Sequence, residues 1–307
     1  MSNKRVLIVG TGGVGGTLAA FLKLGGCSVD CIARGEHLEA IRQRGLHLIS
    51  DMKGEHHLPI EVFTAEEYDR KADFIIVCVK GYSLDSVVDV ITRASTPSTI
   101  VIPILNVYGT GPRIARLVPS ATVIDGLIYL AAYKSDVGQI TQTGGMMRLI
   151  FGARPEQGIA RERLQEFSDI LTSAGIPNKL SEDINLDTFI KWSYISATNC
   201  AGLYHDVTMG GLQFAGPAQD MFCALSRESQ AIGESLGIVF PRPMDEYNVK
   251  VASGINPQST ASTQKDIAAG RTSEIQGMLF DMIDLGRRQG IPTPTYDLVA
   301  ERFKHLK

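Results

Sequence analysis

The sequence lacks the features that mark several specialised classes of protein. Aromatic residues make up 7% of its 307 residues, and no basic run is interleaved with them, so we do not expect a nucleic-acid partner. The net charge of −3 points the same way. The longest apolar stretches, residues 74–79 and 100–105, are of strand length, far below the roughly eighteen residues that span a bilayer. We therefore expect no membrane association.

Cysteine is also scarce. The five cysteines form no Cys-x-x-Cys pair and no His/Cys cluster of the kind that holds zinc. An odd number of scattered cysteines is typical of buried thiols in a reducing compartment, which predicts a cytoplasmic protein. His56 and His57 are the only adjacent histidines, and neighbouring residues on a strand point to opposite faces. We therefore predict no metal site.

The most informative feature present is a glycine-rich turn near the start of the chain. Residues 4–9 predict an apolar strand, residues 17–23 a helix and residues 29–33 a second strand. A G-x-G-x-x-G pattern between such a strand and helix is the setting in which a Rossmann fold binds a dinucleotide, with the diphosphate on backbone N–H groups at the helix start. The residues predicted to bind the cofactor here are Gly10, Thr11, Gly12, Gly13, Val14 and Gly15.

The choice of cofactor depends on the end of the second strand. NAD-specific domains place an acidic residue there, about twenty residues past the first glycine. Asp30 has about this spacing, but it lies near the start of the strand, and Arg34 emerges at its end. A guanidinium group would bind a ribose 2′-phosphate, whereas a carboxylate would repel it. We therefore predict NADP(H), with an ordinary solvated charge as the alternative for Arg34.

The two halves of the chain differ in pattern. The first alternates strands and helices, whereas helical patterns dominate from about residue 159. We predict an α/β protein with an N-terminal Rossmann-type doubly wound sheet in residues 1–180 and an all-α C-terminal domain in residues 181–307. The later strands of the first half are short enough to form an antiparallel edge of the sheet. Further strands are predicted at 46–50, 58–63, 72–79, 99–105, 121–132, 139–143 and 148–151, and helices at 37–44, 83–94, 111–118, 161–174, 184–203, 217–236, 243–252 and 273–289.

Four polar residues stand where a ligand could be bound. Lys80 and Asn106 follow two buried strands, and ligands of Rossmann sheets bind beyond the carboxyl ends of the strands. Lys191 and Asn199 share one stripe of a predicted helix and could point into a cleft. The alternatives are a solvated loop or turn cap for Lys80 and Asn106, and a lysine that extends along a helix edge to water for Lys191.

Over almost its whole length the chain resembles the ketopantoate reductase (2-dehydropantoate 2-reductase) family. The most specific part of the resemblance is a serine, then an aspartate, then Glu-Ile near the C-terminus, which Rossmann proteins in general do not share. The resemblance rests on residues 10–15, 29–38, 77–80, 105–106, 109–110, 191–192, Asn199, 262–267 and 272–275.

The resemblance implies a reaction in which NADPH reduces the ketone of a 2-keto acid. In that reaction Lys191 matches the general acid, and Glu274 would accept a hydrogen bond from the new hydroxyl group. Ser262 would bind the substrate carboxylate, while Asn106 and Asn199 would orient the substrate. The residues implied to hold the cofactor, besides the glycine-rich turn, are Arg34, Lys80, Asn106, Ala132 and Glu274.

Several positions depart from the family pattern. Val107 replaces a glycine, Ile195 replaces an asparagine one turn past the lysine, and Cys200 replaces a proline. Ser259 and Met209 fall near positions where polar amides are expected. Fewer hydrogen-bond donors would weaken discrimination for ketopantoate, so the reaction type is better supported than the substrate.

Three functions remain open at this stage. The first is reduction of ketopantoate in pantothenate biosynthesis, and the second is NADPH-dependent reduction of another 2-keto acid. The third is a non-catalytic NADP-sensing protein, although a sensor has no need of an acid, a carboxylate anchor and a hydroxyl acceptor. An interface formed by the helical domain would suit this architecture and would give a homodimer.

Overall fold

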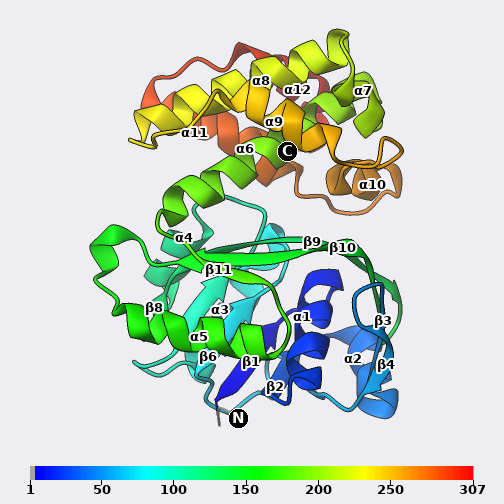
Figure 1. Ribbon diagram of the computed structural model, residues 1–307, viewed down its shortest axis with the longest axis vertical. Helices are drawn as coiled ribbons and strands as arrows, with labels where there is room; N and C mark the ends of the chain where they lie inside the picture. The colour runs from blue at the N-terminus through cyan, green and yellow to red at the C-terminus, as the bar shows by residue number, and fades with distance from the viewer. Residues whose placement is uncertain (1–3, 307) are drawn as a thin grey trace. The chain divides into compact units, whose positions relative to one another are not determined.

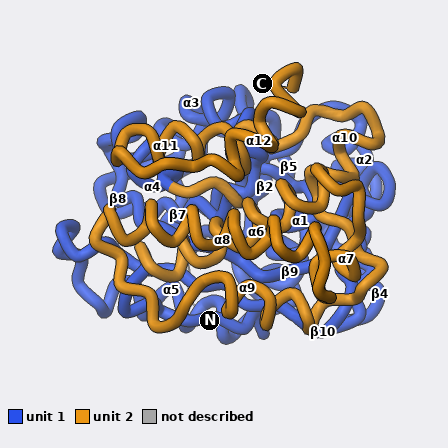
Figure 2. Tube along the Cα trace, turned by 90° about the horizontal axis from the view of Figure 1, so that it is seen from above, with its two compact units in different colours: residues 1–105, 109–184 blue, residues 106–108, 185–307 orange. Residues whose placement is uncertain are grey.

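The computed structural model describes residues 4–306 and contains two compact units (Figure 2). Unit 1 comprises residues up to 105 and residues 109–184, and unit 2 comprises residues 106–108 and 185–307. The second unit thus begins after Ile184 rather than after Leu180, where the sequence analysis placed the boundary. Nothing in the sequence pattern assigned the segment Asn106–Tyr108 to the helical unit.

Unit 1 contains a six-stranded sheet with the strand order of the Rossmann fold, β5-β2-β1-β6-β7-β8 (Figure 1). Every pairing within it is parallel. Its apolar strands suit a sheet that is covered on both faces, and the predicted doubly wound sheet is confirmed. The strands are β1 (Arg5–Val9), β2 (Ser28–Ile32), β5 (Glu61–Phe63), β6 (Phe74–Val77), β7 (Ile100–Pro103) and β8 (Thr122–Val123).

The remaining strands form a second sheet, so the prediction that the later strands extend the first sheet as an antiparallel edge is wrong. The central strand of this sheet is β10, which pairs in parallel with β3 and β11 and antiparallel with β9. β3 also pairs with β4, and these two strands form a hairpin. The strands are β3 (Leu46–Ser50), β4 (Gly54–Leu58), β9 (Asp125–Asp136), β10 (Gln139–Gly152) and β11 (Asn178–Leu180).

Two predicted strand boundaries in this region also differ from the structure. The strands predicted at 139–143 and 148–151 are one strand, β10, with a register shift between Thr143 and Met147. The strand predicted at 58–63 is divided, since Leu58 ends β4 in the second sheet and Glu61 begins β5 in the first. Pro59 lies between them and has no N–H group with which to continue a ladder.

Helices and the second sheet cover the two faces of the first sheet. Alternate residues of β1 show the division: Val6 and Ile8 belong to the core that contains α1 and α5, and Leu7 and Val9 to the core that contains α3 and α4. α1 packs against both sheets, which explains its almost complete burial. The helices are α1 (Gly13–Leu24), α2 (Gly35–Arg44), α3 (Val88–Ala94), α4 (Thr110–Leu117) and α5 (Arg161–Ser173), with short 3₁₀ turns η1 (Gly81–Ser83), η2 (Asp85–Val87) and η3 (Pro155–Gln157).

The regular elements of unit 2 are all helices in the part of the chain that the structure describes, which confirms the predicted all-α second domain. Its core forms around buried aromatic side chains, among them Phe189, Trp192, Phe222 and Tyr296. The helix predicted at 273–289 begins instead as a wide π-helical turn, η4 (Gln276–Phe280). The other elements are α6 (Ile184–His205), α7 (Met209–Gln213), α8 (Pro217–Ser235), α9 (Met244–Ser253), α10 (Ser262–Ala268), α11 (Asp281–Gln289), α12 (Pro294–Phe303) and η5 (Lys304–Leu306).

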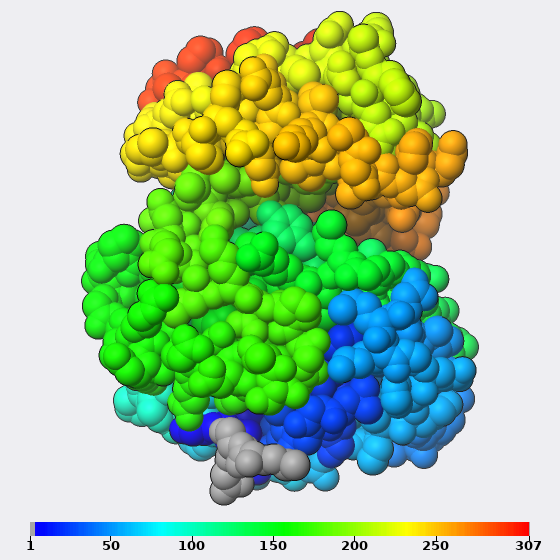
Figure 3. Space-filling model, viewed as in Figure 1, coloured from blue at the N-terminus to red at the C-terminus, as the bar shows by residue number. Residues whose placement is uncertain are grey.

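Within the described part of the chain, no helix is both long and apolar enough to cross a membrane. The five cysteines are all free thiols, of which Cys31 and Cys200 are buried. In the space-filling view, the β3–β4 hairpin forms part of the exposed surface of unit 1 (Figure 3).

Candidate functional site

The glycine-rich turn of unit 1 has a shape that only glycine allows at several positions. Gly10 has a φ angle of +97°, which side chains of L-residues rarely adopt. A Cβ atom on Gly15 would lie 1.9 Å from the carbonyl oxygen of Gly10, and one on Gly13 would lie 2.4 Å from that of Ala132. The turn is therefore packed tightly against β1 and β9, and the predicted residue Ala132 lies beside it.

The remaining side of the turn is open. A Cβ atom on Gly12 would meet no atom within 4 Å, although Gly12 stands at the N-cap of α1. The Thr11 hydroxyl group is buried and has no hydrogen-bond partner among the described residues. A phosphate group could bind here, because the turn leaves open space at Gly12, the Thr11 hydroxyl group has no partner in the described part of the chain, and the N-terminus of α1 carries a partial positive charge. The turn thus fits the diphosphate of a dinucleotide.

A histidine that the sequence analysis did not assign to the site holds this turn in place. His37 is buried on α2, and its Nδ1 atom accepts a hydrogen bond from the Gly138 N–H at 2.9 Å. Its Nε2 atom therefore carries the proton and donates to the Thr11 carbonyl oxygen at 2.8 Å. Burial lowers the pKa of His37, which favours this neutral form. The only signal in the sequence was the position of His37 shortly after the second strand.

The segments that carry Arg34 and Lys80 border the same turn. The Gly10 N–H donates to the Ile32 carbonyl oxygen at 3.1 Å, next to the end of β2. A Cβ atom on Gly10 would lie 2.9 Å from Cγ1 of Val79, the residue before Lys80. Arg34 is exposed, and its side chain makes no hydrogen bond or ion pair with the residues the structure describes. Its guanidinium group is thus available to a ligand.

Asp30, in contrast, is committed to the protein. It is buried in the middle of β2, and Arg5 Nη1 donates to its Oδ2 atom at 2.7 Å. Tyr68 donates to the same oxygen at 3.0 Å, and Arg70 lies 3.3 Å from Oδ1. A carboxylate with three partners inside the fold does not serve as a ligand for the ribose of a dinucleotide.

Unit 2 contains a buried lysine. The Lys191 side chain on α6 is 8% exposed, and its Nζ atom donates to Asn106 Oδ1 at 2.9 Å. Burial lowers the pKa of Lys191 from 10.5 to about 8, although the negative charge of Glu274 acts to raise it. The lysine therefore does not extend along the helix edge to water. An ammonium group with a pKa near neutrality is suited to donate a proton.

Asn106 reaches this lysine because its neighbours are anchored in unit 2. The Tyr108 ring stacks on Trp192 with centroids 5.4 Å apart and meets Phe189 edge-on at 5.1 Å. Val107 packs so closely against Gly277 that a Cβ atom there would lie 2.5 Å from Cγ2 of Val107. These contacts assign Asn106 to the helical unit, although it follows β7 in the chain, and its predicted role beside the nicotinamide with Lys80 stays a prediction.

The π-helical turn that follows Glu274 is held by side chains of α6. Trp192 Nε1 donates to the Gly277 carbonyl oxygen at 2.9 Å, and the Ser196 hydroxyl group donates to that of Met278. These bonds satisfy carbonyl groups in a stretch where regular helical bonding is interrupted. Such turns occur often at functional sites. Glu274, two residues before the turn, is buried.

The other two predicted substrate residues lie on different helices, Asn199 on α6 and Ser262 at the start of α10. Asn199 is buried, and its Oδ1 atom accepts the Thr263 N–H at 3.2 Å while its Nδ2 atom donates to the Ile195 carbonyl oxygen at 2.7 Å. Asn199 thus fixes the first turn of the helix on which the exposed Ser262 stands. Direct contacts of Asn199 and Ser262 with a substrate stay predictions.

Comparison with known proteins identifies the family. Residues 6–156 match the sequence model described as ketopantoate reductase PanE/ApbA, and residues 183–307 match the model of its C-terminal part. The chain belongs to the ketopantoate reductase family. It is accordingly a member of a family of NAD(P)-dependent oxidoreductases.

Full-length relatives of this chain have modest sequence identity to it. A 2-dehydropantoate 2-reductase of Mesorhizobium japonicum is 29% identical, with 98% of this chain and 97% of the relative covered. The crystal structure of a putative ketopantoate reductase from Ralstonia solanacearum is 27% identical, with coverage of 99% and 98% and a TM-score of 0.86. A D-mandelate dehydrogenase with NADH and anilino(oxo)acetate shares the fold, at 21% identity, coverage of 97% and 96% and a TM-score of 0.86.

The residues predicted for the reductase site thus form two groups. Those of unit 1 gather at the glycine-rich turn, where Arg34, Lys80 and Ala132 border it. Those of unit 2 centre on Lys191, with Asn106 bonded to it and Glu274 close enough to influence its pKa. The first group has the properties of a dinucleotide site and the second those of a proton donor.

Proposed function

We propose that the protein reduces 2-dehydropantoate to pantoate with NADPH, a step of pantothenate biosynthesis. The observation that carries the proposal is the buried ammonium group of Lys191, held by Asn106 and with a pKa of about 8. The family assignment and the similarity to 2-dehydropantoate 2-reductases over the full chain support the substrate. The proposed site is therefore catalytic rather than a sensor of the cofactor.

The glycine-rich turn holds the cofactor in this proposal. The diphosphate binds at Gly12 and the Thr11 hydroxyl group, where the structure leaves space and an unpartnered donor. Arg34 binds the 2′-phosphate, because its guanidinium group is exposed while Asp30 is engaged inside the fold. These two features favour NADPH over NADH. When bound, NADPH supplies the hydride for the reaction.

Lys191 acts as the general acid. As the keto carbon becomes tetrahedral, negative charge develops on its oxygen, and Lys191 Nζ donates a proton to that oxygen. A positioned acid of this kind contributes about 10²- to 10⁴-fold to the rate. The neutral amine then regains a proton from solvent before the next turnover. Asn106 orients the ammonium group through the bond at 2.9 Å.

The remaining polar residues bind and orient the substrate. Ser262 donates a hydrogen bond to the carboxylate, and its place at the first position of α10 is fixed by Asn199. Glu274 accepts a hydrogen bond from the product hydroxyl group. Lys80 contributes a positive charge to the cofactor side. Each of these roles is matched to the family's pattern at the same position.

A second candidate is the reduction of a different 2-keto acid. Ile195 is a partly buried apolar residue of the helical core, and Met209 is buried at the start of α7. Neither can donate the side-chain hydrogen bonds expected for the hydroxylated substrate ketopantoate. The shared fold of D-mandelate dehydrogenase supports this candidate, because that protein is seen with anilino(oxo)acetate and NADH.

A panel of 2-keto acids tests both candidates. NADPH oxidation is followed with 2-dehydropantoate and with branched, linear and aryl 2-keto acids, and then repeated with NADH. The highest kcat/KM with 2-dehydropantoate and NADPH supports the proposal. A higher value with another acid supports the second candidate. Tight NADPH binding without turnover of any acid contradicts both and favours a sensor.

A further inference from the structure

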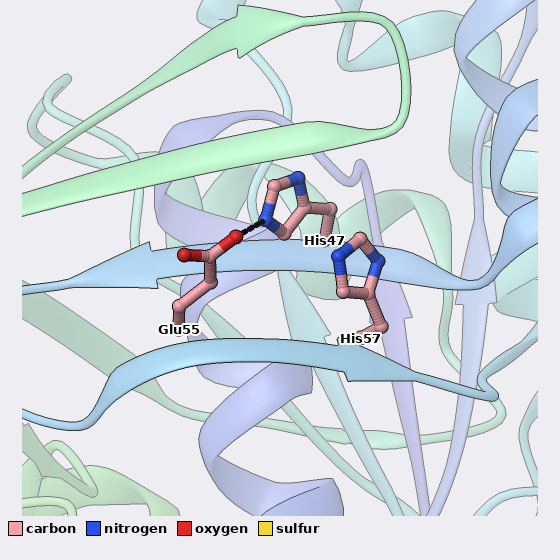
Figure 4. A group of neighbouring side chains, drawn as sticks. All are labelled: His47, Glu55 and His57. Carbon is pink, nitrogen blue, oxygen red and sulfur yellow. Dashed lines mark hydrogen bonds and ion pairs between the residues drawn. The ribbon is translucent and has the colours of Figure 1, made fainter.

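We propose that the solvent-facing side of the β3–β4 hairpin binds one divalent transition-metal ion of the zinc class through His47, Glu55 and His57 (Figure 4). None of these residues belongs to the glycine-rich turn or to the lysine cluster. The ion would connect the two strands of the hairpin. The proposal is thus independent of the reduction proposed above.

The register of the hairpin brings the three side chains together. His47 on β3 is paired with His57 on β4, and directly opposite residues point to the same face of a sheet. Glu55 lies two residues before His57 on the same strand and therefore shares that face. Two imidazoles and a carboxylate are thus fixed by backbone pairing rather than by chance contacts of long side chains.

The distances suit a small metal ion. His47 Nε2 and Glu55 Oε1 are 2.8 Å apart, and one ligand atom from each of the three residues lies within 4.8 Å of the others. Tetrahedral Zn²⁺ with bonds of about 2.0–2.1 Å places its ligand atoms about 3.4 Å apart. This separation lies between the observed 2.8 Å and the upper limit of 4.8 Å. Because the His47 and His57 ring planes lie within 13° of parallel, at least one ring must turn before both imidazole nitrogens point at one ion.

One face of the hairpin packs in the core, and the other face, which carries the three ligands, is exposed to solvent. Leu46, Leu48 and Leu58 point the other way and are buried in the core, which holds both strands rigidly. The ligand side is open, since the side chains of His47 and Glu55 are 21% and 64% exposed. An ion can enter from solvent, and water can occupy the fourth position.

The donor set selects the class of ion. Two imidazole nitrogens and one carboxylate oxygen are ligands that Zn²⁺ takes in proteins, whereas Mg²⁺ and Ca²⁺ prefer oxygen atoms alone. The His47 and His57 rings are stacked, with centroids 4.0 Å apart. An ion bound at Nε2 of His47 would replace the hydrogen bond between His47 and Glu55.

The test is a titration of the full-length, untagged protein with Zn²⁺ by isothermal calorimetry. It is performed at about pH 7.5, because Zn²⁺ binds the neutral form of an imidazole. We expect one equivalent to bind, and the affinity to fall at least about tenfold in His57→Ala and in Glu55→Gln. His56→Ala is the matched control, because His56 is the next residue along β4 and bonds to the Lys53 carbonyl oxygen at 2.8 Å.

A second measurement separates loss of the site from loss of the fold. Zn²⁺ should raise the melting temperature of the wild type and of His56→Ala in a concentration-dependent way, while Mg²⁺ should not. His57→Ala should melt like the wild type when no metal is added and should show no increase with Zn²⁺. No binding to the wild type, or equal binding to His57→Ala, overturns the proposal.

Discussion

The glycine-rich turn of unit 1 and the lysine cluster of unit 2 are built in opposite ways. The turn is a continuous stretch, residues 10–15, in which backbone atoms and the absence of side chains create the binding surface. The cluster joins three side chains from distant parts of the chain, Asn106, Lys191 and Glu274. The turn has no room for a Cβ atom at Gly13 or Gly15, whereas the lysine cluster depends on single polar and charged groups. The following experiments test this difference.

Lys191→Met should have the largest effect. We expect kcat for the keto acid to fall by about 10²- to 10⁴-fold because the proton donor is lost. The dissociation constant of NADPH should stay within about twofold of the wild-type value, because the turn is untouched. Stopped-flow kinetics and fluorescence titration measure the two quantities. Lys250→Met, an exposed lysine on α9, is the matched control and should retain activity.

Lys191→Met also distinguishes a catalytic role of Lys191 from a role in folding. A buried ammonium group with a lowered pKa opposes folding, so the free energy of unfolding of Lys191→Met at pH 7 should equal or exceed that of the wild type. A protein that loses activity, NADPH binding and stability together would contradict the assignment of Lys191 as a proton donor.

Arg34→Ala should change the choice of cofactor. Hydrogen bonds to charged groups contribute about 1.5–3 kcal/mol, so the KM for NADPH should rise by roughly 10- to 100-fold. The KM for NADH should change little, because NADH has no 2′-phosphate. Steady-state kinetics with both cofactors measure the ratio, and Arg44→Ala near the other end of α2 is the control. Equal losses with NADPH and NADH would show that Arg34 does not recognise the phosphate.

The pH dependence of the reaction should report the state of Lys191. Keto-acid reduction needs the ammonium form, so kcat/KM should fall about tenfold per pH unit above about pH 8. Stability should change in the opposite direction: the native state loses its proton near pH 8 and the unfolded state only near 10.5, so the unfavourable contribution of Lys191 diminishes across that interval. A kcat/KM profile that stays flat to pH 10 would argue against this acid.

Among the four predicted changes in kinetics, the effect of His37→Ala should be the smallest. The Thr11 carbonyl group and the Gly138 N–H each lose a partner. A lost hydrogen bond costs about 1 kcal/mol, so the KM for NADPH should rise about fivefold. The value of kcat should be unchanged, since His37 holds the turn and touches no reacting atom. An equal fall in kcat with no change in KM would assign His37 a different role.

Local sequence predicted the backbone site well. The order of strand, turn and helix over residues 4–23 requires only neighbouring residues, and the structure has β1, the turn and α1 in that order. The lysine was also visible, because its place on α6 follows from helical spacing. Its partner was not, since the contact between Asn106 and Lys191 depends on how Tyr108 and Val107 pack in the helical unit.

The pairing of strands that are distant in the chain could not be predicted from the sequence either. That β10 joins β3 rather than the edge of the Rossmann sheet depends on pairing across about ninety residues of chain. The prediction of no metal site considered only the adjacent residues His56 and His57, and it stays a prediction. The register that sets His47 opposite His57 cannot be seen in either stretch alone.

The assignment of residues 106–108 to unit 2 bears on how this architecture could be rebuilt by recombination. A fragment starting at residue 185 would carry Lys191 but lack Asn106, and its Trp192 would lose the tyrosine that stacks on it. Grafting the helical half onto another nucleotide-binding domain therefore requires transplanting a three-residue insert as well as the C-terminal segment. A chimera that omits the insert contains Lys191 without the Asn106 side chain that accepts its hydrogen bond.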